Sequence, residues 1–581
     1  MLRYRLLLFF CLGCILTTKA THNRAGEITY SWVTGLTYKI KVTTYTNIGG
    51  PNLADRCEDT VYFGDGTRAV VLRTNGPTSA SCGAGIGGGS PISTTIKFNE
   101  YETTHTYPGP GNYLITMTDP NRNANVINIP NSVNQTFYIE SLLVIPPFGS
   151  GKNNSPVLTF PPIDDGCVSQ CFYHNPGAYD IDGDSISYEL TTCRGSGGTT
   201  CPGYSYPVTG GGIFSIDSLT GTLTWCMPQL QGEYNMAMLI KEWRLNNSGS
   251  YVLVGYVLRD LQVSVGSCNN NPPQIPVIAT DTCILAGTTL TYNVQATDIN
   301  NDQITLWAEG GPFAFASNPA TFSSTTGTSS ITGIFNWTTD STHIRRLPYQ
   351  VTVKVKDADP AISLVHFQTF NVKVLPAAPI FLTTYPYNDH ILLKWNKPAT
   401  YNHTGANAFL KYNVYRKTGL SNWMHSGCET IPPAATGFVF IGSTTSVVTD
   451  TVFYDYNSGN PLAVGQSYSY VVLAQYIDGA TSYVSNISSN QLYVGIEELE
   501  LNNSVSVFPN PVTENLTISF NQNTTELFTV ELCDVTGRNL KTVITKESTI
   551  QFKTQDMKPG IYFLKISGDK RTSLIKKIIK Q

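Results

Sequence analysis

The sequence has few charged residues and no long apolar stretch beyond its first twenty residues. Of its 581 residues, 13% are Asp, Glu, Lys or Arg, and the formal net charge is −4. A chain without a basic excess has no field that attracts nucleic acid, so we expect no nucleic-acid partner. No segment reaches the roughly 18 continuous apolar residues that a membrane-spanning helix needs, so we expect no transmembrane segment.

Signatures of common enzymes are also missing. The chain has only 8 His, and neither an H-E-x-x-H pair nor a G-x-S-x-G nucleophile motif occurs. The stretch from Gly83 to Gly88 does read G-x-G-x-x-G. It lies in a Ser- and Gly-rich segment with no strand–helix unit around it, which favours a flexible loop over a dinucleotide site. We therefore expect a protein that is not an enzyme and that needs no organic cofactor.

Turn residues and aromatic residues are abundant instead. The chain contains 49 Gly, 33 Pro and 32 Tyr. Short stretches of alternating apolar and polar residues are separated by Gly, Pro, Asn and Asp, and amphipathic helical periodicity is nearly absent. This pattern predicts an all-β fold. At this length we expect a linear, elongated array of four or five immunoglobulin-like β-sandwich domains.

The first twenty residues have the layout of a secretory signal peptide. Arg3 and Arg5 precede the apolar run from Leu6 to Leu16, and Ala20 ends a small-x-small cleavage site. We therefore assign residues 1–20 to a signal peptide and place the mature start at residue 21. Cys14 leaves a lipoprotein signal as an alternative.

The end of the chain carries four marks in order. They are the opening Pro509-Asn510-Pro511, the turn that contains Asp534, Gly537 and Arg538, the strand entry with Gly560 and Tyr562, and the Lys-rich tail 576–580. Together they resemble the C-terminal sorting domain of proteins exported by the type IX secretion system of Bacteroidetes, here residues 496–581. The resemblance implies export through the periplasm to the cell surface or medium. It also implies two partners, a translocon and a sorting peptidase, the latter often attaching the new end to a lipid.

Residues 21–148 resemble a PKD domain, which is a β-sandwich. The resemblance rests on the stretch from Phe63 to Thr67, which reads F-G-D-G-T, and on the stretch from His105 to Met117. Physically, F-G-D-G predicts a tight turn capped by the aspartate, with the aromatic ring facing the core. That role is structural rather than catalytic.

Residues 149–268 and 269–375 look like two diverged copies of one repeat. The stretch 178–188 aligns with 296–306, and the segment that ends at Trp225 aligns with the one that ends at Trp337. Both copies resemble cadherin-like domains of the dystroglycan type, and the third domain is also compatible with a general immunoglobulin-like sandwich. The repetition favours a rod of sandwiches with both tryptophans in their cores.

Asp180, Asp182 and Asp184 form the strongest candidate site. Three carboxylates on one turn repel each other unless a cation or hydrogen bonds hold them, and an oxygen-rich cluster suits Ca²⁺. We therefore expect a calcium site here, with a solvated turn stabilised by side-chain hydrogen bonds as the alternative. In the third domain Asp298, Asn300 and Asp302 keep the oxygen atoms with less charge. An EF-hand loop is absent from the sequence.

Residues 376–495 resemble a fibronectin type III domain. Trp395 takes the place of the core tryptophan, and Tyr468 lies near the start of a strand where such domains anchor a corner. The insertion 421–438 carries Trp423, Met424 and Cys428. This loop either caps the sandwich or binds a protein or glycan.

Eleven cysteines remain after removal of the signal peptide, and the exported route favours disulfides. We predict the pairs Cys57–Cys82, Cys193–Cys201 and Cys268–Cys283. The odd number leaves at least one thiol, which we assign to Cys533. Cys167 and Cys171 have a zinc-like spacing but no second half for such a site.

Two functions from different classes fit these features. The first is a non-catalytic exported surface protein, an adhesin or structural stalk with an unknown protein or glycan ligand. The second is an accessory protein whose first domain binds or cuts polysaccharide. Trp32, Tyr38 and Tyr45 in that domain alternate as core residues do, which favours the first function.

Overall fold

The computed structural model describes residues 23–48, 56–79, 82–147, 152–246, 248–278, 281–323, 325–387, 389–399, 401, 408–425, 427–457, 462–492, 505–520, 527–568 and 573–581. The predicted signal peptide lies outside these residues. The described part consists of β-strands joined by turns and loops, and it contains no α-helix and therefore no helix that could cross a membrane. Its helical turns are η1 (Ser132–Asn134), η2 (Ser196–Gly198), η3 (Gly311–Ala314), η4 (Ser341–His343) and η5 (Ala434–Thr436).

The first two units share one continuous twelve-stranded sheet. Strand β15, from the second half of this region, pairs with β14 along one edge and with both β8 and β1 along the other. The predicted boundary at residue 148 is therefore wrong as a division between separate sheets. The strands of the first unit are β1 (Asn23–Thr34), β2 (Thr37–Asn47), β3 (Glu58–Tyr62), β4 (Arg68–Leu72), β5 (Ser90–Pro91), β6 (Ile96–Thr106), β7 (Gly111–Asp119) and β8 (Phe137–Ile145).

The second unit begins after residue 151 and ends with the shared strand. A small separate sheet, β10-β13-β12, packs its buried Trp225 into a hydrophobic cluster with β14 and β15. Its strands are β9 (Gly166–Cys167), β10 (Cys171–His174), β11 (Ser185–Thr191), β12 (Phe214–Ile216), β13 (Leu223–Cys226), β14 (Gly232–Leu245) and β15 (Tyr251–Gly266).

The third unit is a sandwich of a five-stranded and a three-stranded sheet. Along β21 every second residue is buried, the period-two pattern of a strand with one face in the core, and Trp337 is fully buried there. Its strands are β16 (Asp281–Leu285), β17 (Thr289–Thr297), β18 (Gln303–Gly310), β19 (Thr321–Phe322), β20 (Thr325–Thr328), β21 (Ser330–Thr338), β22 (Tyr349–Asp357) and β23 (Val365–Leu375).

The fourth unit packs a three-stranded sheet on a four-stranded one. Trp395 is buried in the core, as expected, and the hydroxyl of Tyr468 accepts a 2.9 Å hydrogen bond from the backbone of Ala463. Its strands are β24 (Ile380–Pro386), β25 (Ile391–Asn396), β26 (Phe409–Thr418), β27 (Val439–Ser443), β28 (Val452–Asp455), β29 (Ser467–Tyr476) and β30 (Ser488–Gln491).

The fifth unit is a second sandwich of three and four strands. Phe528, Val530 and Leu532 are buried while the residues between them are partly exposed, which confirms the alternation predicted for this strand. Its strands are β31 (Val505–Phe508), β32 (Asn515–Phe520), β33 (Phe528–Cys533), β34 (Asn539–Thr545), β35 (Thr549–Lys553), β36 (Gly560–Gly568) and β37 (Ser573–Lys580). The predicted all-β array of sandwiches is thus confirmed.

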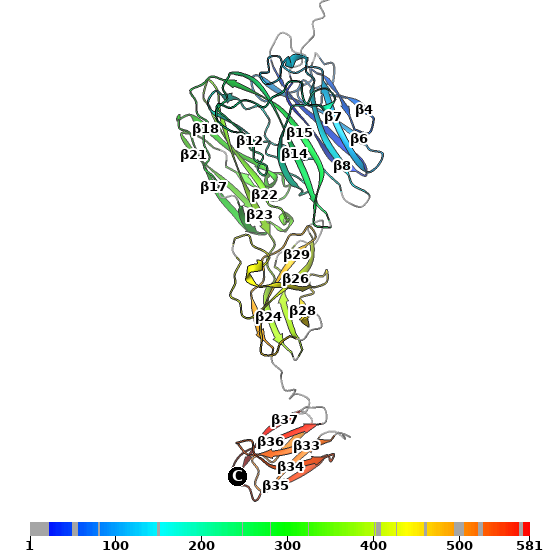
Figure 1. Ribbon diagram of the computed structural model, residues 1–581, viewed down its shortest axis with the longest axis vertical. Helices are drawn as coiled ribbons and strands as arrows, with labels where there is room; N and C mark the ends of the chain where they lie inside the picture. Colours follow the sequence, from blue (N-terminus) through cyan, green and yellow to red (C-terminus); the bar gives the residue numbers. More distant parts are fainter. Residues whose placement is uncertain are drawn as a thin grey trace, which may run out of the picture.

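The first three units pack beside one another, and the fourth follows at one end of that group (Figure 1). The contact between the second and third units is built around the buried Lys354. Its ammonium group bonds Asp164 at 2.6 Å and lies 5.1–5.8 Å from the ring centres of Phe160, Trp307 and Phe367. Burying a lysine is tolerable only because this carboxylate and these rings compensate for its lost hydration.

Four disulfides occur among the described residues, and only one of them is a predicted pair. Cys57 bonds Cys82, as expected. The predicted Cys268–Cys283 bond is wrong, since Cys268 bonds Cys167 and Cys283 bonds Cys428. The fourth disulfide joins Cys171 to Cys226 across the paired strands β10 and β13. Because Cys167 and Cys171 belong to separate disulfides, the zinc alternative falls away.

Three described cysteines are free. Cys193 and Cys201, which we predicted to be bonded, are both buried beside the Arg122–Asp260 ion pair and remain thiols. Cys533 is free, as predicted, but only half-buried. Pairing by closeness in sequence therefore failed in two ways. Cys268 and Cys283 bond more distant cysteines, and Cys193 and Cys201 stay unpaired.

Candidate functional site

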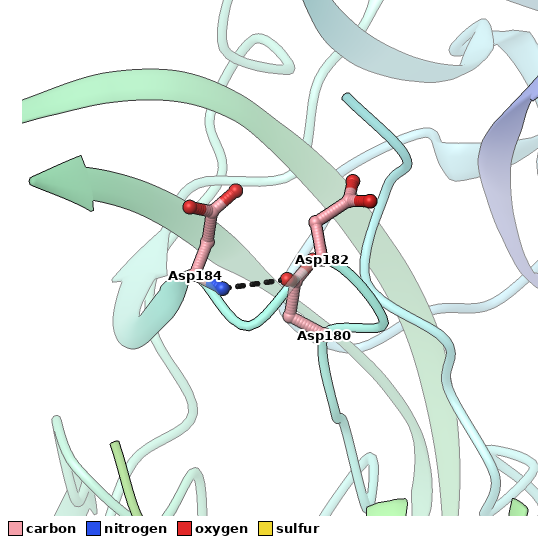
Figure 2. Close-up of side chains that lie close together, drawn as sticks. All are labelled: Asp180, Asp182 and Asp184. Atoms are coloured by element: carbon pink, nitrogen blue, oxygen red, sulfur yellow. Dashed lines mark hydrogen bonds between the residues drawn. The ribbon is translucent and has the colours of Figure 1, made fainter. Parts of the chain in front are cut away.

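The three predicted carboxylates meet on one turn, between a bridge at Tyr179 and strand β11 (Figure 2). One ligand atom from each of Asp180, Asp182 and Asp184 lies within 4.8 Å of the others. The backbone N–H of Asp184 donates to Oδ1 of Asp180 at 2.7 Å. Gly183 has a φ of +84°, which a residue with a side chain rarely adopts, and this lets the chain reverse so tightly. We call residues 180–184 the second-unit acid turn.

Two of these carboxylates are already compensated by other side chains. Arg244 donates from Nε to Asp184 at 2.9 Å and from Nη2 to its other oxygen, and it lies 3.9 Å from Asp182. Asn154 donates to Asp182 from its backbone at 2.7 Å and from its amide at 2.8 Å. Sequence reasoning missed Arg244 because no local pattern marks it. It reaches the turn only because β14 pairs with β11.

Asp180 lies near the buried Glu242, and its charge acts on that carboxyl group. Oδ2 of Asp180 and Oε1 of Glu242 are both buried, and neither has a hydrogen-bond partner. Burial, followed by the charge of Asp184, raises the pKa of Asp180 to about 6. Burial, followed by the charge of Asp180, raises the pKa of Glu242 well above its usual value.

The third unit repeats the turn in detail. The backbone of Asp302 donates to Oδ1 of Asp298 at 3.0 Å, as Asp184 does to Asp180. The backbone of Asn271 donates to Oδ1 of Asn300 at 3.0 Å, as Asn154 does to Asp182. Asn301, with a φ of +63°, stands where the first copy has Gly183. We call residues 298–302 the third-unit acid turn.

Strand register shows which residues correspond behind the two turns. Ile186 pairs with Glu242 in the second unit, and Ile304 pairs with Asp357 in the third. Arg244 lies two positions after Glu242, and Asp359 lies two positions after Asp357. The guanidinium of one copy is therefore replaced by a carboxylate in the other.

The third-unit acid turn is left without a cation from the protein. Within the described residues no Lys or Arg forms an ion pair with Asp298, Asp302 or Asp359, and the Oδ2 atoms of Asp298 and Asp302 are buried without a donor. Burial, followed by the charges of Asp298 and Asp359, raises the pKa of Asp302. Carboxylate and amide oxygens with unused lone pairs fit a hard divalent cation such as Ca²⁺. In the second unit such an ion would compete with Arg244.

The motif residues at the end of the chain build turns and one long-range clamp. Asp534 accepts hydrogen bonds from the backbones of Thr536 and Arg538, at 3.0 and 3.1 Å, and Gly537 completes the turn with a φ of +79°. Tyr562 donates from its hydroxyl to the carbonyl of Lys558 at 2.9 Å.

Asn510, from the opening motif, joins the two ends of this unit. Its amide donates to the carbonyl of Lys577 at 2.7 Å, and its oxygen accepts from the backbone of Ile579 at 2.8 Å. The opening Pro509-Asn510-Pro511 segment is thus fixed against the last strand, β37. The marks recognised in sequence are parts of one folded domain rather than separate signals.

No curated protein matches the sequence. Among solved structures, a crystal structure of titin domains shares 12% identity, over 58% of this chain and 99% of that one, with a TM-score of 0.19. A two-domain fibronectin type III segment of chicken tenascin shares 13% identity, over 35% of this chain and 98% of that one, with a TM-score of 0.16. Scores this low do not define a common arrangement of domains.

A family model does match the end of the chain. Residues 506–581 match the secretion system C-terminal sorting domain, and the clamp and turns described above fall within this segment. Such a domain interacts with the type IX secretion system, which carries its substrates to the cell surface or the extracellular space. The chain is therefore an exported protein with a type IX C-terminal sorting domain behind a series of β-sandwich units.

Proposed function

We propose that the protein is a non-catalytic scaffold at the cell surface, an adhesin or stalk whose sandwiches hold a ligand-binding end away from the membrane. The observation that carries this proposal is the bonding between successive units. The first and second units share a sheet through β15, the second and third meet around Lys354, and a disulfide joins the third to the fourth. Such coupling suits a protein that must keep its shape under mechanical force.

The disulfides also support a mechanical role. Cys167 and Cys268 lie at the start and end of the second unit, 101 residues apart, and Cys283 and Cys428 bridge 145 residues. A force applied along the chain passes through these bonds, so most of the second and third units is shielded from unfolding. The loop 421–438, which carries Cys428, then serves as a strap between units.

We further propose that Ca²⁺ is a structural cofactor of the acid turns. In the second unit the ion would have to displace Arg244 from Asp182 and Asp184. In the third unit Asp359 replaces that arginine, so binding requires no displacement. The third-unit acid turn is therefore filled first, and Asp180, Asp182 and Asp184 bind more weakly than their number suggests.

The sorting domain supports two processing steps after export, cleavage and attachment to a lipid. We propose that a sorting peptidase cuts in the segment before residue 505 and that the new end is joined to a surface lipid. Proteomics of the mature C-terminus on intact cells tests this step. A surface form that still carries residues 506–581 would contradict it.

The scaffold proposal is tested by attachment of cells under flow. A strain lacking the gene is complemented with the full chain, with a chain lacking residues 496–581, or with Cys283 and Cys428 both changed to Ser. The full chain is expected to restore attachment, and the truncated chain to stay in the periplasm. The cysteine variant should be displayed but detach at lower shear, whereas Cys533→Ser, which removes only a free thiol, should behave as wild type. Unchanged attachment of the strain lacking the gene would contradict the proposal.

A further inference from the structure

The contact between the second and third units holds a lysine and an aspartate side by side, away from water. Nζ of Lys354, on β22, lies 2.6 Å from Oδ1 of Asp164, and the two residues are 4% and 5% exposed. They stand 190 positions apart in the chain. An amine and a carboxyl group are the two halves of an amide bond, and folding has already brought them together, which removes much of the entropic part of the barrier.

Aromatic rings enclose this pair. Trp307 and Phe367 are the register partners of Lys354 on the neighbouring strands β18 and β23, so one ring flanks it on each side. Phe160, from the second unit, completes the enclosure, and the three ring centres lie 5.1–5.8 Å from Nζ. Because these rings shield the pair from water, an amide bond formed here would be protected from hydrolysis.

At rest the two groups form an ion pair. Burial alone would raise the pKa of Asp164, but the charge of Lys354 outweighs it and lowers that pKa to about 2. Burial also lowers the pKa of Lys354, which brings the neutral amine closer in free energy. Transfer of one proton along the 2.6 Å contact converts the ion pair into a neutral amine and a neutral acid, which are the reactive forms.

His174 is placed to assist at the other carboxylate oxygen. Its ring is fully buried, and Nδ1 lies 3.7 Å from Oδ2 of Asp164. Burial lowers the pKa of His174 to about 4, so the ring is neutral at neutral pH. Nη1 of Arg259 approaches Nε2 at 3.4 Å, and because a guanidinium only donates, Nε2 accepts and Nδ1 carries the proton. Neither Nδ1 of His174 nor Oδ2 of Asp164 has any other partner.

We propose that Nζ of Lys354 and Cγ of Asp164 join in an amide bond, which cross-links the second and third units covalently. The neutral amine attacks Cγ, and the negative charge that develops on Oδ2 is stabilised by the Nδ1–H of His174. The Cγ–Oδ1 bond then breaks, and Oδ1 leaves as water with two protons, both from the original ammonium group. One hydrogen remains on the amide nitrogen, His174 is unchanged, and no oxidant or other reagent is consumed. The cross-link goes beyond the scaffold function and does not depend on it.

Mass spectrometry of the intact chain of residues 21–581, after reduction of its disulfides, tests the proposal. We expect the wild type to be lighter than its sequence by the mass of one water molecule. After digestion with trypsin, peptides 153–194 and 347–356 should be found joined, with the chain uncut after Lys354. Fragmentation of the joined peptides should place the bond on Asp164 rather than on the neighbouring Asp165.

Variants assign the bond to its two ends. Lys354→Arg keeps the positive charge but cannot form this amide, so it should have the full mass of its sequence. Lys356→Arg, two positions further along the same strand, is the matched control and should keep the mass deficit, as should Asp165→Asn. On a reducing, denaturing gel the closed loop of 190 residues should make the wild type and Lys356→Arg migrate faster than Lys354→Arg.

His174→Phe keeps a ring in the same space but removes the donor. The fraction of lighter chain, followed after a brief induction of expression, should rise about a hundredfold more slowly than in the wild type. A purely structural role would lower the melting temperature without changing this rate, and equal rates would overturn the part given to His174.

The wild type decides the proposal as a whole, whether or not a variant folds. A reduced wild type with the full mass of its sequence would overturn it, as would a mass deficit that persists in Lys354→Arg. A bond located on Asp165 would overturn the assignment of Asp164.

Discussion

The second and third units carry the same acid turn, but the two turns differ in what balances their charge. In both turns, the backbone N–H of the last aspartate donates to the carboxylate of the first. The backbone N–H of an asparagine from the preceding segment donates to the side chain of the middle residue. Behind them Arg244 faces one turn, while Asp359 occupies the corresponding register position at the other. The difference shows that the sequence motif specifies the turn, whereas a residue about 60 positions away specifies its electrostatics.

The largest effects should be the same in both copies, because the cores are what the copies share. Trp225 and Trp337 are each fully buried. Changing either to Ala should lower the free energy of unfolding of its own unit by about 3–5 kcal/mol, through lost burial and the cavity left behind. Differential scanning calorimetry of the two variants measures this. A loss below about 1 kcal/mol in one copy would show that its tryptophan does not anchor the core.

Removing Arg244 should affect only the second unit. Arg244→Gln leaves Asp182 and Asp184 facing each other without their cation, and we expect a loss of about 3 kcal/mol in the free energy of unfolding. Millimolar Ca²⁺ should restore part of that loss by taking the vacated position. The change in melting temperature with and without Ca²⁺ measures both effects. Stability that stays at the wild-type value would mean that the ion pair to Asp184 contributes little.

The raised pKa of Asp180 predicts a pH dependence of the stability of the second unit. Because the pKa of Asp180 is raised to about 6, the folded state binds a proton that the unfolded state has already lost. The stabilising contribution is complete below about pH 4 and disappears as the pH rises to about 6, a change of about 2–3 kcal/mol.

Asp180→Asn removes this titration. The free energy of unfolding of the variant, minus that of the wild type, should therefore rise from pH 4 to pH 6. Urea unfolding of both proteins across this range measures the difference, in which the titration of groups distant from Asp180 cancels. A constant difference would contradict the raised pKa of Asp180.

The smallest effect should come from converting the third-unit acid turn into a copy of the second. Asp359→Arg supplies the missing guanidinium and should raise stability without Ca²⁺ by about 1 kcal/mol or less, as expected for a partly exposed pair. It should also remove the response to Ca²⁺. Thermal melts with Ca²⁺ and with a chelator measure both changes, and a variant that keeps the full response would place the ion elsewhere.

Local patterns were sufficient for the parts of the fold that local sequence determines. Alternation along residues 528–532 predicted a strand, and the aspartate turn at Asp65 predicted a cap, which the structure shows as a 2.9 Å bond from the backbone of Thr67. The proximity of Asp180, Asp182 and Asp184 also followed from their spacing.

Features that depend on strand pairing between distant segments could not be read from the sequence. The sharing of β15 between two units, the approach of Arg244 to the acid turn and the Cys167–Cys268 bond all join residues far apart in the chain. A boundary drawn at a proline-rich seam and a disulfide drawn between neighbouring cysteines fail for the same reason. Both use sequence distance as a substitute for distance in space.

Calorimetric titration of Ca²⁺ into the chain of residues 21–581 tests most directly whether the two turns are balanced differently. The account predicts one ion for the wild type, none for Asp302→Asn and two for Arg244→Gln. Ca²⁺ binding that is unchanged in Asp302→Asn but lost in Asp184→Asn would contradict the account.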